Sequence, residues 1–375
     1  MPCFSPLASP AATIASLQKW GLYTKKSLGQ HFLIDDGVIG RILRLADLQP
    51  QVPIVEIGPG IGTLTEALLI AGSEVLAIEI DQRFEPLLAD IAERYPQQFS
   101  YLLADALTLL SDDLPGRFDI VANLPYALAA TIVLDAFQRY DGLETATVMV
   151  QREVAQRIMA QPNTKAYGAF TVKLALLAEV RGSFAVSPSS FLPAPRVDST
   201  VISLRRLAGD KNLVVGEQRV ISLVDESQAI GDLPDSQTGD KTLAAGEQQT
   251  NPSGGEILAP GSQQPNPTGG KYLVATEQQT NHLCWEFARQ IIDAAFAERR
   301  KTLRNSLRSN LNEQRVVVSS LPDTPADAEQ KLKVFSTEII DSALALAGLA
   351  GGRRAESLSV QDFIELLQAF QAILR

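Results

Sequence analysis

The chain is poor in residues that bind metals or form cross-links. Its 375 residues include two cysteines, Cys3 and Cys284, and two histidines, His31 and His282. Neither cysteine has a second cysteine at the spacing of a Cys-x-x-Cys motif. This argues against a structural zinc site and against a disulfide framework. We therefore expect a protein without a bound metal that works in the reducing cytoplasm.

Long hydrophobic runs are missing as well. No apolar stretch reaches the length of about 20 residues that a membrane-spanning helix needs. The stretch from Met1 to Gln18 is rich in Ala, Ser and Pro, and the first basic residue is Lys19. It lacks the charged start and the clean apolar core of a signal peptide. We expect no membrane partner, and we expect residues 1–19 to be a disordered tail or to reflect the choice of start site.

The net charge has the wrong sign for a protein that binds nucleic acid. It is formally −10 for the whole chain. Residues 207–281 hold ten acidic and four basic side chains, a net charge of −6, which leaves −4 for the rest of the chain. Any face that binds nucleic acid must therefore be a local basic patch, because the protein as a whole has no positive electrostatic field.

The acidic segment also contains an internal repeat. Residues 241–255 and 256–270 are two copies of a 15-residue unit, and a third copy begins at Lys271. The units are rich in Gln, Gly, Pro and Asn and have little to bury. We interpret 207–281 as a disordered insertion produced by tandem duplication. A small β-solenoid is the alternative, because each unit carries an apolar pair and a turn signal.

Before this insertion, the chain alternates between two hydrophobic periods. Short apolar runs predict strands at 52–57, 74–80, 100–103, 118–122 and 145–151. Helical spacing predicts helices at 35–47, 63–71, 83–95, 129–140, 153–159 and 169–179. Such alternation indicates a parallel, doubly wound sheet, so we predict a Rossmann-like α/β domain over 20–206. Two more strands, at 183–186 and 200–204, would form an antiparallel edge.

After the insertion, the spacing becomes helical again from Leu283, and the chain ends with a predicted helix at Val360–Leu374. We interpret 282–375 as a small all-helical domain. The segment from Ala297 to Arg308 contains five basic residues, and we expect it to be a helix whose basic face binds RNA phosphates. A charged face that is merely solvated is the alternative.

The run Asn123-Leu124-Pro125-Tyr126 directly follows a predicted strand. An adenine N6 amino group is a poor nucleophile because its lone pair is delocalised into the ring. The Asn123 oxygen and a backbone carbonyl of Leu124 or Pro125 can accept hydrogen bonds from this amino group and aim its lone pair at a methyl donor. Tyr126 can stack on the base. The alternative is an ordinary turn at the end of a strand.

Three preceding strand ends carry residues that suit an adenosyl ligand. The glycine-rich turn Gly58–Gly62 opens a helix, which lets the backbone approach a ligand closely and offers free NH groups. Glu79 can accept hydrogen bonds from both ribose hydroxyls, with Asp81 as its competitor. Asp105 is placed to accept from an adenine amino group. Together with the run at Asn123, these residues predict a site for S-adenosylmethionine rather than NAD.

Two loops carry further candidates. His31 follows a basic turn that begins at Lys25, and a lone histidine of this kind is more often structural than catalytic. Phe191 opens a loop that two prolines make stiff and extended. It can form the second face of a clamp around a splayed-out base. The alternative is that Phe191 is a core residue under the loop.

Six motifs occur together in one order: G-Q-H-F-L at 29–33, E-I-G-P-G at 56–60, I-E-I-D at 78–81, N-L-P-Y at 123–126, F-x-P-x-P-R-V-D-S at 191–199 and F-A-E-R-R-K-T-L-R-N-S-L at 296–307. In these motifs and their order, the chain resembles the ribosomal RNA adenine N6-dimethyltransferase family, the bacterial KsgA (RsmA) type. The resemblance covers roughly 20–206 and 283–375. The acidic repeat insertion is foreign to the compact form of that family.

The resemblance implies a cofactor, a substrate and a set of roles. The cofactor would be S-adenosylmethionine, touched by His31, Leu33, Gly58, Glu79, Asp105 and Asn123. The substrate would be two adjacent adenines in a hairpin loop near the 3′ end of small-subunit rRNA, in an assembling 30S subunit, and each adenine would receive two methyl groups. Asn123 and the Pro125 backbone would hold the target N6, and Tyr126 and Phe191 would sandwich the base. Nothing in the sequence demands more than a monomer.

Three other functions compete with this interpretation. A related enzyme could methylate large-subunit rRNA, as the antibiotic-resistance branch does, but the basic motif at 296–307 and the Phe191 loop favour the small-subunit branch. A ribosome-assembly factor could have lost catalysis, but Glu79, Asp105 and the N-L-P-Y run are intact. A DNA adenine methyltransferase would need a DNA-reading domain, and we find none in the sequence.

Overall fold

The structure is a computed structural model that describes residues 3–23, 30–207, 285–311, 315–318 and 331–374. The predicted repeat insertion lies outside the described residues, except for Leu207, and so does the basic turn from Lys25 to Gly29. Neither prediction is therefore tested.

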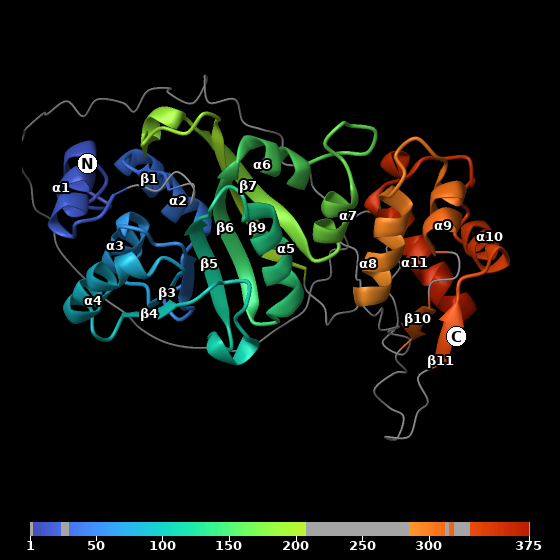
Figure 1. Cartoon of the computed structure of the whole chain (residues 1–375), viewed down its shortest axis with the longest axis horizontal. Coiled ribbons are helices and arrows are strands. Elements are labelled where there is room, and N and C mark those ends of the chain that lie inside the picture. Colours follow the sequence, from blue (N-terminus) through green and yellow to red (C-terminus); the bar gives the residue numbers. More distant parts are fainter. Residues whose placement is uncertain (1–2, 24–29, 208–284, 312–314, 319–330, 375) are drawn as a thin grey trace, which may run out of the picture. The chain divides into compact units, whose positions relative to one another are not determined.

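A seven-stranded sheet forms the centre of the first region, with the order β4-β3-β2-β5-β6-β9-β7 (Figure 1). Its strands are β2 (Ile54–Ile57), β3 (Val75–Glu79), β4 (Phe99–Leu103), β5 (Phe118–Asn123), β6 (Leu143–Gln151), β7 (Ala178–Val186) and β9 (Ser199–Arg206). Strands β2 to β6 pair in parallel, and β9 is antiparallel to both of its neighbours. The predicted doubly wound α/β sheet is confirmed. The two further predicted strands also form the antiparallel edge of the sheet, since β7 is its last strand and β9 lies between β6 and β7.

Helices cover both faces of this sheet: α2 (Asp36–Ala46), α3 (Thr63–Ile70), α4 (Glu85–Arg94), α5 (Ala129–Arg139), α6 (Arg152–Ile158) and α7 (Ala169–Ala175). Alternate strand residues enter two separate cores, since successive side chains of a strand point to opposite faces. Val121 packs in the core that includes α2, α3 and α4, whereas Ile120 and Ala122 pack in the core that includes α5. Helix α7 is shorter than predicted because Ala178 already pairs with Arg206 as the start of β7.

The N-terminal segment is ordered, so the predicted disordered tail is wrong for residues 3–19. Helix α1 spans Pro10–Lys19, and the Ser9 side chain caps it. The backbone NH groups of Phe4 and Ser5 donate to the carboxylate of Asp36, the latter at 2.8 Å. The Ala/Ser/Pro composition suggested disorder, but Ser followed by Pro is also a strong start signal for a helix.

The C-terminal region contains the helices α8 (Trp285–Phe296), α9 (Leu303–Leu311), α10 (Thr337–Leu346) and α11 (Val360–Leu374), and the hairpin strands β10 (Arg315–Val318) and β11 (Lys331–Val334). The helical character is confirmed, and α11 has the predicted bounds. The region is not purely helical, because β10 and β11 pair in antiparallel. The run of three valines in β10 is a strand signal that the helical interpretation overlooked.

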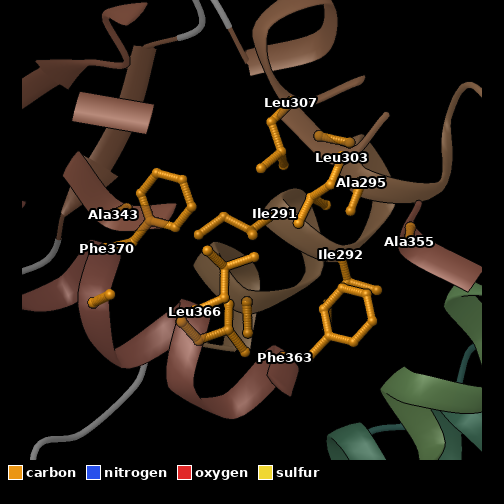
Figure 2. Close-up of a cluster of buried hydrophobic side chains, with 14 of the residues drawn as sticks. Ile291, Ile292, Ala295, Leu303, Leu307, Ala343, Ala355, Phe363, Leu366 and Phe370 are labelled. Atoms are coloured by element: carbon orange, nitrogen blue, oxygen red, sulfur yellow. The ribbon is translucent and has the colours of Figure 1, made fainter. Parts of the chain in front are cut away.

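Buried apolar side chains of these helices form one core, which Figure 2 shows around Ile291, Phe363 and Phe370. Helix α7 takes part in this core through Val172, although the predicted domain boundary assigns α7 to the first domain. Just before α7, the Tyr167 hydroxyl donates to the Leu358 carbonyl at 2.7 Å. The packing therefore ties α7 to the C-terminal helices as well as to the core beneath the sheet, which Leu174 enters.

Candidate active site

Most of the predicted site residues lie at the carboxyl ends of the parallel strands, which form the carboxyl edge of the sheet. Glu79 and Asn123 end strands β3 and β5, and the glycine turn and Asp105 follow strands β2 and β4. The order of the strands along the chain reverses between β2 and β5. Ligands of open α/β sheets bind at such a switch point, outside the carboxyl ends of the strands. The Ala104 NH donates to the Glu79 carbonyl at 2.9 Å, which links the loop after β4 to the end of β3.

The glycine turn needs glycine for both conformation and space. Gly60 has a φ of +54°, and a Cβ atom there would lie 3.0 Å from the Phe32 ring. Gly58 has a φ of +73°, and a Cβ atom there would lie 3.9 Å from Pro125, so this turn adjoins the N-L-P-Y loop. Helix α3 starts directly after the turn, at Thr63. The NH groups of its first turn therefore face the same edge of the sheet.

The structure separates the two acidic candidates after β3. Glu79 is 6% exposed and accepts from the NH groups of Gly60, at 3.2 Å, and Asp81, at 2.9 Å. Burial raises the pKa of Glu79, and these two hydrogen bonds oppose the shift. Asp81 instead binds the Arg83 guanidinium, at 2.5 Å, and the Gln30 amide, at 3.2 Å. The Arg83 guanidinium bonds both Asp81 oxygens and lowers the pKa of Asp81, so this carboxylate is already engaged.

Two further polar groups at this edge suit an adenosyl ligand. Asp105 accepts from the Leu107 NH at 2.9 Å through Oδ1, which orients the carboxylate and leaves Oδ2 for a ligand. The Thr63 hydroxyl is buried and has no hydrogen-bond partner among the described residues. A buried hydroxyl without a partner is costly, and a ligand at the start of α3 would satisfy it. The residues present therefore fit the adenosyl ligand. The sequence analysis missed Thr63, which follows the third glycine of the turn.

Asn123 and His31 are joined across 92 positions of sequence. The Asn123 amide nitrogen donates to the His31 backbone carbonyl at 3.1 Å. Since a carbonyl only accepts, this bond directs the amide oxygen of Asn123 away from His31. The His31 ring is held in turn, because its Nδ1 lies 2.7 Å from the Pro193 carbonyl oxygen. His31 thus positions Asn123 and leaves the Asn123 oxygen as an oriented acceptor.

Tyr126 is fixed at both its ring and its hydroxyl. Its ring stacks on the His31 ring, with 5.4 Å between centroids and 23° between planes. Its hydroxyl lies 2.6 Å from the Ser199 Oγ, and burial raises its pKa. One ring face is therefore covered, and a base would stack on the other. Ser199 received no role in the sequence analysis, although it ends the F-x-P-x-P motif.

In the N-L-P-Y loop, the Pro125 carbonyl already accepts one hydrogen bond. The Pro125 carbonyl accepts from the Leu128 NH at 3.0 Å, which closes a turn before α5. One lone pair of the Pro125 oxygen remains. The Pro125 carbonyl can therefore still accept a second hydrogen bond.

Phe191 and Leu33 lie in the core. They face each other in a two-stranded antiparallel sheet of β1 (Phe32–Leu33) and β8 (Phe191–Leu192). Phe191 is 2% exposed and belongs to the core that α2, α3 and α4 share. The expected clamp on a base is not formed in this structure, and the core interpretation is the one that the burial supports. The pairing with Leu33 and the packing of the core draw the Phe191 ring inward.

The predicted basic helix at 297–308 is wrong over its first half. Helix α8 ends at Phe296, and α9 begins only at Leu303. The turn is fixed because the Leu303 NH donates to the Arg353 carbonyl, at 2.6 Å, and the Ser306 hydroxyl donates to the Ala294 carbonyl, at 2.7 Å. These contacts come from residues distant in sequence, which periodicity does not detect.

Acidic neighbours also neutralise much of this basic segment. Arg304 and Arg308 both bind the carboxylate of Asp341, at 3.1 and 2.5 Å. Lys301 binds Glu298 at 2.6 Å. These basic side chains are therefore paired with acidic ones in the absence of RNA.

In the part of the chain that the structure describes, no group of three His, Cys, Asp or Glu side chains is placed to hold a metal ion. None of the described helices combines the length and the apolar character needed to cross a membrane.

Comparison with known sequences identifies relatives along the whole chain. The profile of a family described as "Ribosomal RNA adenine dimethylase" matches residues 21–222. A Shouchella clausii protein named "Ribosomal RNA small subunit methyltransferase A" is 32% identical, over 98% of this chain and 97% of that protein. A Listeria monocytogenes protein of the same name is 41% identical, over 53% of this chain and 70% of that protein.

Solved structures give the same fold. A dimethyladenosine transferase from Plasmodium falciparum superposes with a TM-score of 0.57 at 18% identity, over 92% of this chain and 98% of that one. The 23S rRNA methyltransferase ErmE superposes with a TM-score of 0.52 at 22% identity, over 90% of this chain and 99% of that one. At such identities, the likeness shows the fold alone.

Proposed function

The chain belongs to the ribosomal RNA adenine dimethylase family, and on this premise we propose that it dimethylates the N6 amino groups of two adjacent adenines in the 3′-terminal hairpin loop of small-subunit (16S) rRNA. As a member of the family, it is an S-adenosylmethionine-dependent rRNA methyltransferase. The choice of the small subunit rests on the relatives, which are named for that subunit and include one that aligns over nearly its full length. We propose that the enzyme acts in the cytoplasm, as a monomer, on an assembling 30S subunit.

We assign the cofactor to the loops after β2, β3 and β4. Glu79 would accept from the ribose hydroxyls and Asp105 from the adenine amino group, while Gly58 lets the ligand approach the backbone. The Thr63 hydroxyl, buried without a partner among the described residues, would gain one. The bound S-adenosylmethionine supplies an activated methyl group on a sulfonium. His31 and Leu33 would help to form the wall of the site. Leu33 is buried, and the His31 carbonyl holds the Asn123 amide.

The single observation that carries the catalytic assignment is the hydrogen bond from Asn123 to the His31 carbonyl. It turns the Asn123 oxygen into an oriented acceptor for one N6 hydrogen of the target adenine. The Pro125 or the Leu124 carbonyl would accept the other, and both bonds together would aim the nitrogen lone pair at the methyl donor. The free face of Tyr126 would stack on the base. No general base need act first, because the proton can leave after methyl transfer.

Mass spectrometry of the product tests this proposal. Unmethylated small subunits are incubated with the full-length protein and labelled S-adenosylmethionine, and the rRNA is digested and sequenced. We expect two neighbouring dimethyladenosines in the 3′-terminal hairpin. Label in large-subunit rRNA instead would assign the chain to the resistance branch. Binding of the subunit without transfer would make it an assembly factor.

A further inference from the structure

A cavity of about 910 Å³ opens beside the end of β6. Its wall is built from Gln151 at the end of β6, from Arg157 in α6, from the segment Lys165–Thr171 that leads into α7, and from Arg299 in the turn before α9. None of these residues belongs to the cofactor site or to the acceptor group around Asn123. The cavity is therefore a separate feature of the fold.

The wall is strongly basic in a chain of net charge −10. It includes the cations Arg152, Arg157, Lys165 and Arg299, and Glu153 is its one acidic residue among those described. Arg152 is paired with Asp198, at 2.7 Å, and Arg299 with Glu356, at 3.7 Å. Both arginines are exposed, and exposed pairs exchange partners at little cost. A ligand with several negative charges fits this wall.

One part of the wall is suited to a planar ligand. The Arg157 guanidinium lies 4.9 Å from the centre of the Phe170 ring, in a cation–π contact, and both side chains are half-buried. The Thr171 hydroxyl donates to the Arg157 carbonyl at 2.7 Å, which ties the end of α6 to the start of α7. Nucleic-acid bases stack on aromatic rings and on guanidinium planes. The pair therefore offers a fixed stacking surface between basic groups.

The cavity adjoins the place proposed for the target base. Gln151 is paired with Ser199 in the sheet, and the Ser199 hydroxyl holds the Tyr126 hydroxyl at 2.6 Å. A strand of RNA whose target base stacks on Tyr126 would therefore have neighbouring nucleotides close to the cavity. A phosphodiester carries a negative charge at every nucleotide, and this matches the basic wall.

We propose that this cavity holds the single-stranded nucleotides next to the target adenine, with a base stacked on Arg157 and Phe170 and phosphates bound by Lys165 and Arg299. The inference rests on the proposed function, since it names the subsite through which that RNA substrate is gripped. It makes Arg157 and Phe170 specificity-determining residues that act on RNA and not on S-adenosylmethionine.

Arg157→Ala and Phe170→Leu test the stacking surface in the full-length protein. Each variant should lower kcat/KM for unmethylated small subunits about ten-fold, the size expected when one stacked base is lost. The KM for S-adenosylmethionine should not change. Arg157→Lys keeps the charge but loses the planar group, so it should be nearly as impaired as Arg157→Ala. The matched control is Arg117→Ala, which removes an exposed arginine paired with Glu144 outside the cavity.

Binding of a fluorescein-labelled single-stranded oligoadenylate gives a readout that does not need catalysis. Lys165→Ala should reduce the salt dependence of log K by about 0.7, the value for one phosphate contact on a single strand. If the wild type methylates rRNA while the variants keep wild-type kcat/KM and oligonucleotide affinity, the cavity proposal is overturned and the proposed function stands. If the wild type binds the oligonucleotide through Arg157 but methylates no adenine, the cavity stands and the proposed function fails. A lower unfolding midpoint with weaker S-adenosylmethionine binding would give the pair a structural role and would also overturn the proposal.

Discussion

The carboxyl edge of the sheet and the helical core of the C-terminal region are stabilised by different interactions. At the sheet edge, single hydrogen bonds join loops that are far apart in sequence, such as Asn123 to His31 and Gly60 to Glu79. The C-terminal core consists mainly of packed apolar side chains such as Ile291 and Phe370 (Figure 2). Aromatic rings also stack in pairs there, such as Phe296 and Phe363.

The two kinds of interaction affect different properties of the protein, namely the orientation of reacting groups and the stability of the fold. A hydrogen bond between half-buried groups contributes about 0.5–1.5 kcal/mol to stability, but it fixes the direction of an acceptor. A buried ring contributes several times more to stability and directs no chemistry. We therefore expect the two regions to respond to substitution in opposite ways, and four changes test this from the largest effect to the smallest.

Phe363→Ala should destabilise the protein most. The side chain is fully buried in the C-terminal core, and its removal should lower the free energy of unfolding by about 3–5 kcal/mol. Urea denaturation measures this loss. Leu346→Ala is the matched control, because Leu346 is 62% exposed on α10 and its truncation should change stability by no more than about 0.5 kcal/mol. Equal effects of both changes would contradict the assignment of the core.

Asn123→Ala should leave the fold intact and abolish most activity. Loss of one oriented acceptor should lower kcat about 100- to 1000-fold, as loss of a single transition-state hydrogen bond does elsewhere. Stability should fall by only about 0.5–1.5 kcal/mol, the value of one hydrogen bond. Asn310→Ala is the control, since the Asn310 amide donates to the Ser306 carbonyl within α9, in the C-terminal region. Single-turnover methylation with bound rRNA measures the rate, and an active Asn123→Ala variant would overturn the site assignment.

Glu79 should make cofactor binding depend on pH. Ribose hydroxyls donate to the ionised carboxylate, and burial raises the pKa of Glu79. Affinity for S-adenosylmethionine should therefore be highest above this raised pKa and should fall as the pH drops through it. Glu79→Gln should lower the affinity about ten-fold, the low end for a hydrogen bond to a charged group, and should remove this pH dependence. Calorimetric titrations with S-adenosylmethionine, carried out from acidic to alkaline pH, measure both effects.

The same substitution should change the stability of the ligand-free protein little at neutral pH, because relief from burying a charge offsets the loss of one of the two NH hydrogen bonds that Glu79 accepts. A carboxyl group whose pKa is raised by folding contributes stability below its unfolded pKa, and this contribution is lost as the pH rises through the folded pKa. Glutamine cannot ionise, so the variant does not lose this stability as the pH rises. A Glu79→Gln variant that unfolds more easily at neutral pH would show that the carboxylate serves the fold rather than the ligand.

Phe191→Leu should have the smallest effect. Leucine keeps an apolar side chain in the core, so stability should fall by less than about 1.5 kcal/mol and methylation should be retained. If Phe191 instead turns toward RNA and clamps the base, the variant will be stable but will lose activity. Rates and unfolding midpoints measured on one preparation separate these outcomes.

Local sequence was sufficient for the elements of the sheet. Strand β5 was expected at 118–122 and spans Phe118–Asn123, and α11 has its predicted bounds. Such elements follow from the periodicity of apolar residues, which is a property of the segment itself. The errors lie where a local signal had two meanings. Ser9 and Pro10 are typical of disordered tails and of helix starts, and the docking of Phe4 and Ser5 beside Asp36 shows which applies.

The sequence by itself determined the doubly wound α/β fold, the glycine turn and the polar residues at the strand ends, because these depend on neighbours along the chain. Only the tertiary structure distinguishes the surroundings of Glu79 and Asp81, since Arg83 and Gln30 bind the Asp81 carboxylate. It also decided that Phe191 is buried and that Asp341 neutralises two arginines of α9. These outcomes depend on which side chains meet across the fold, and no period or spacing in the sequence encodes such contacts.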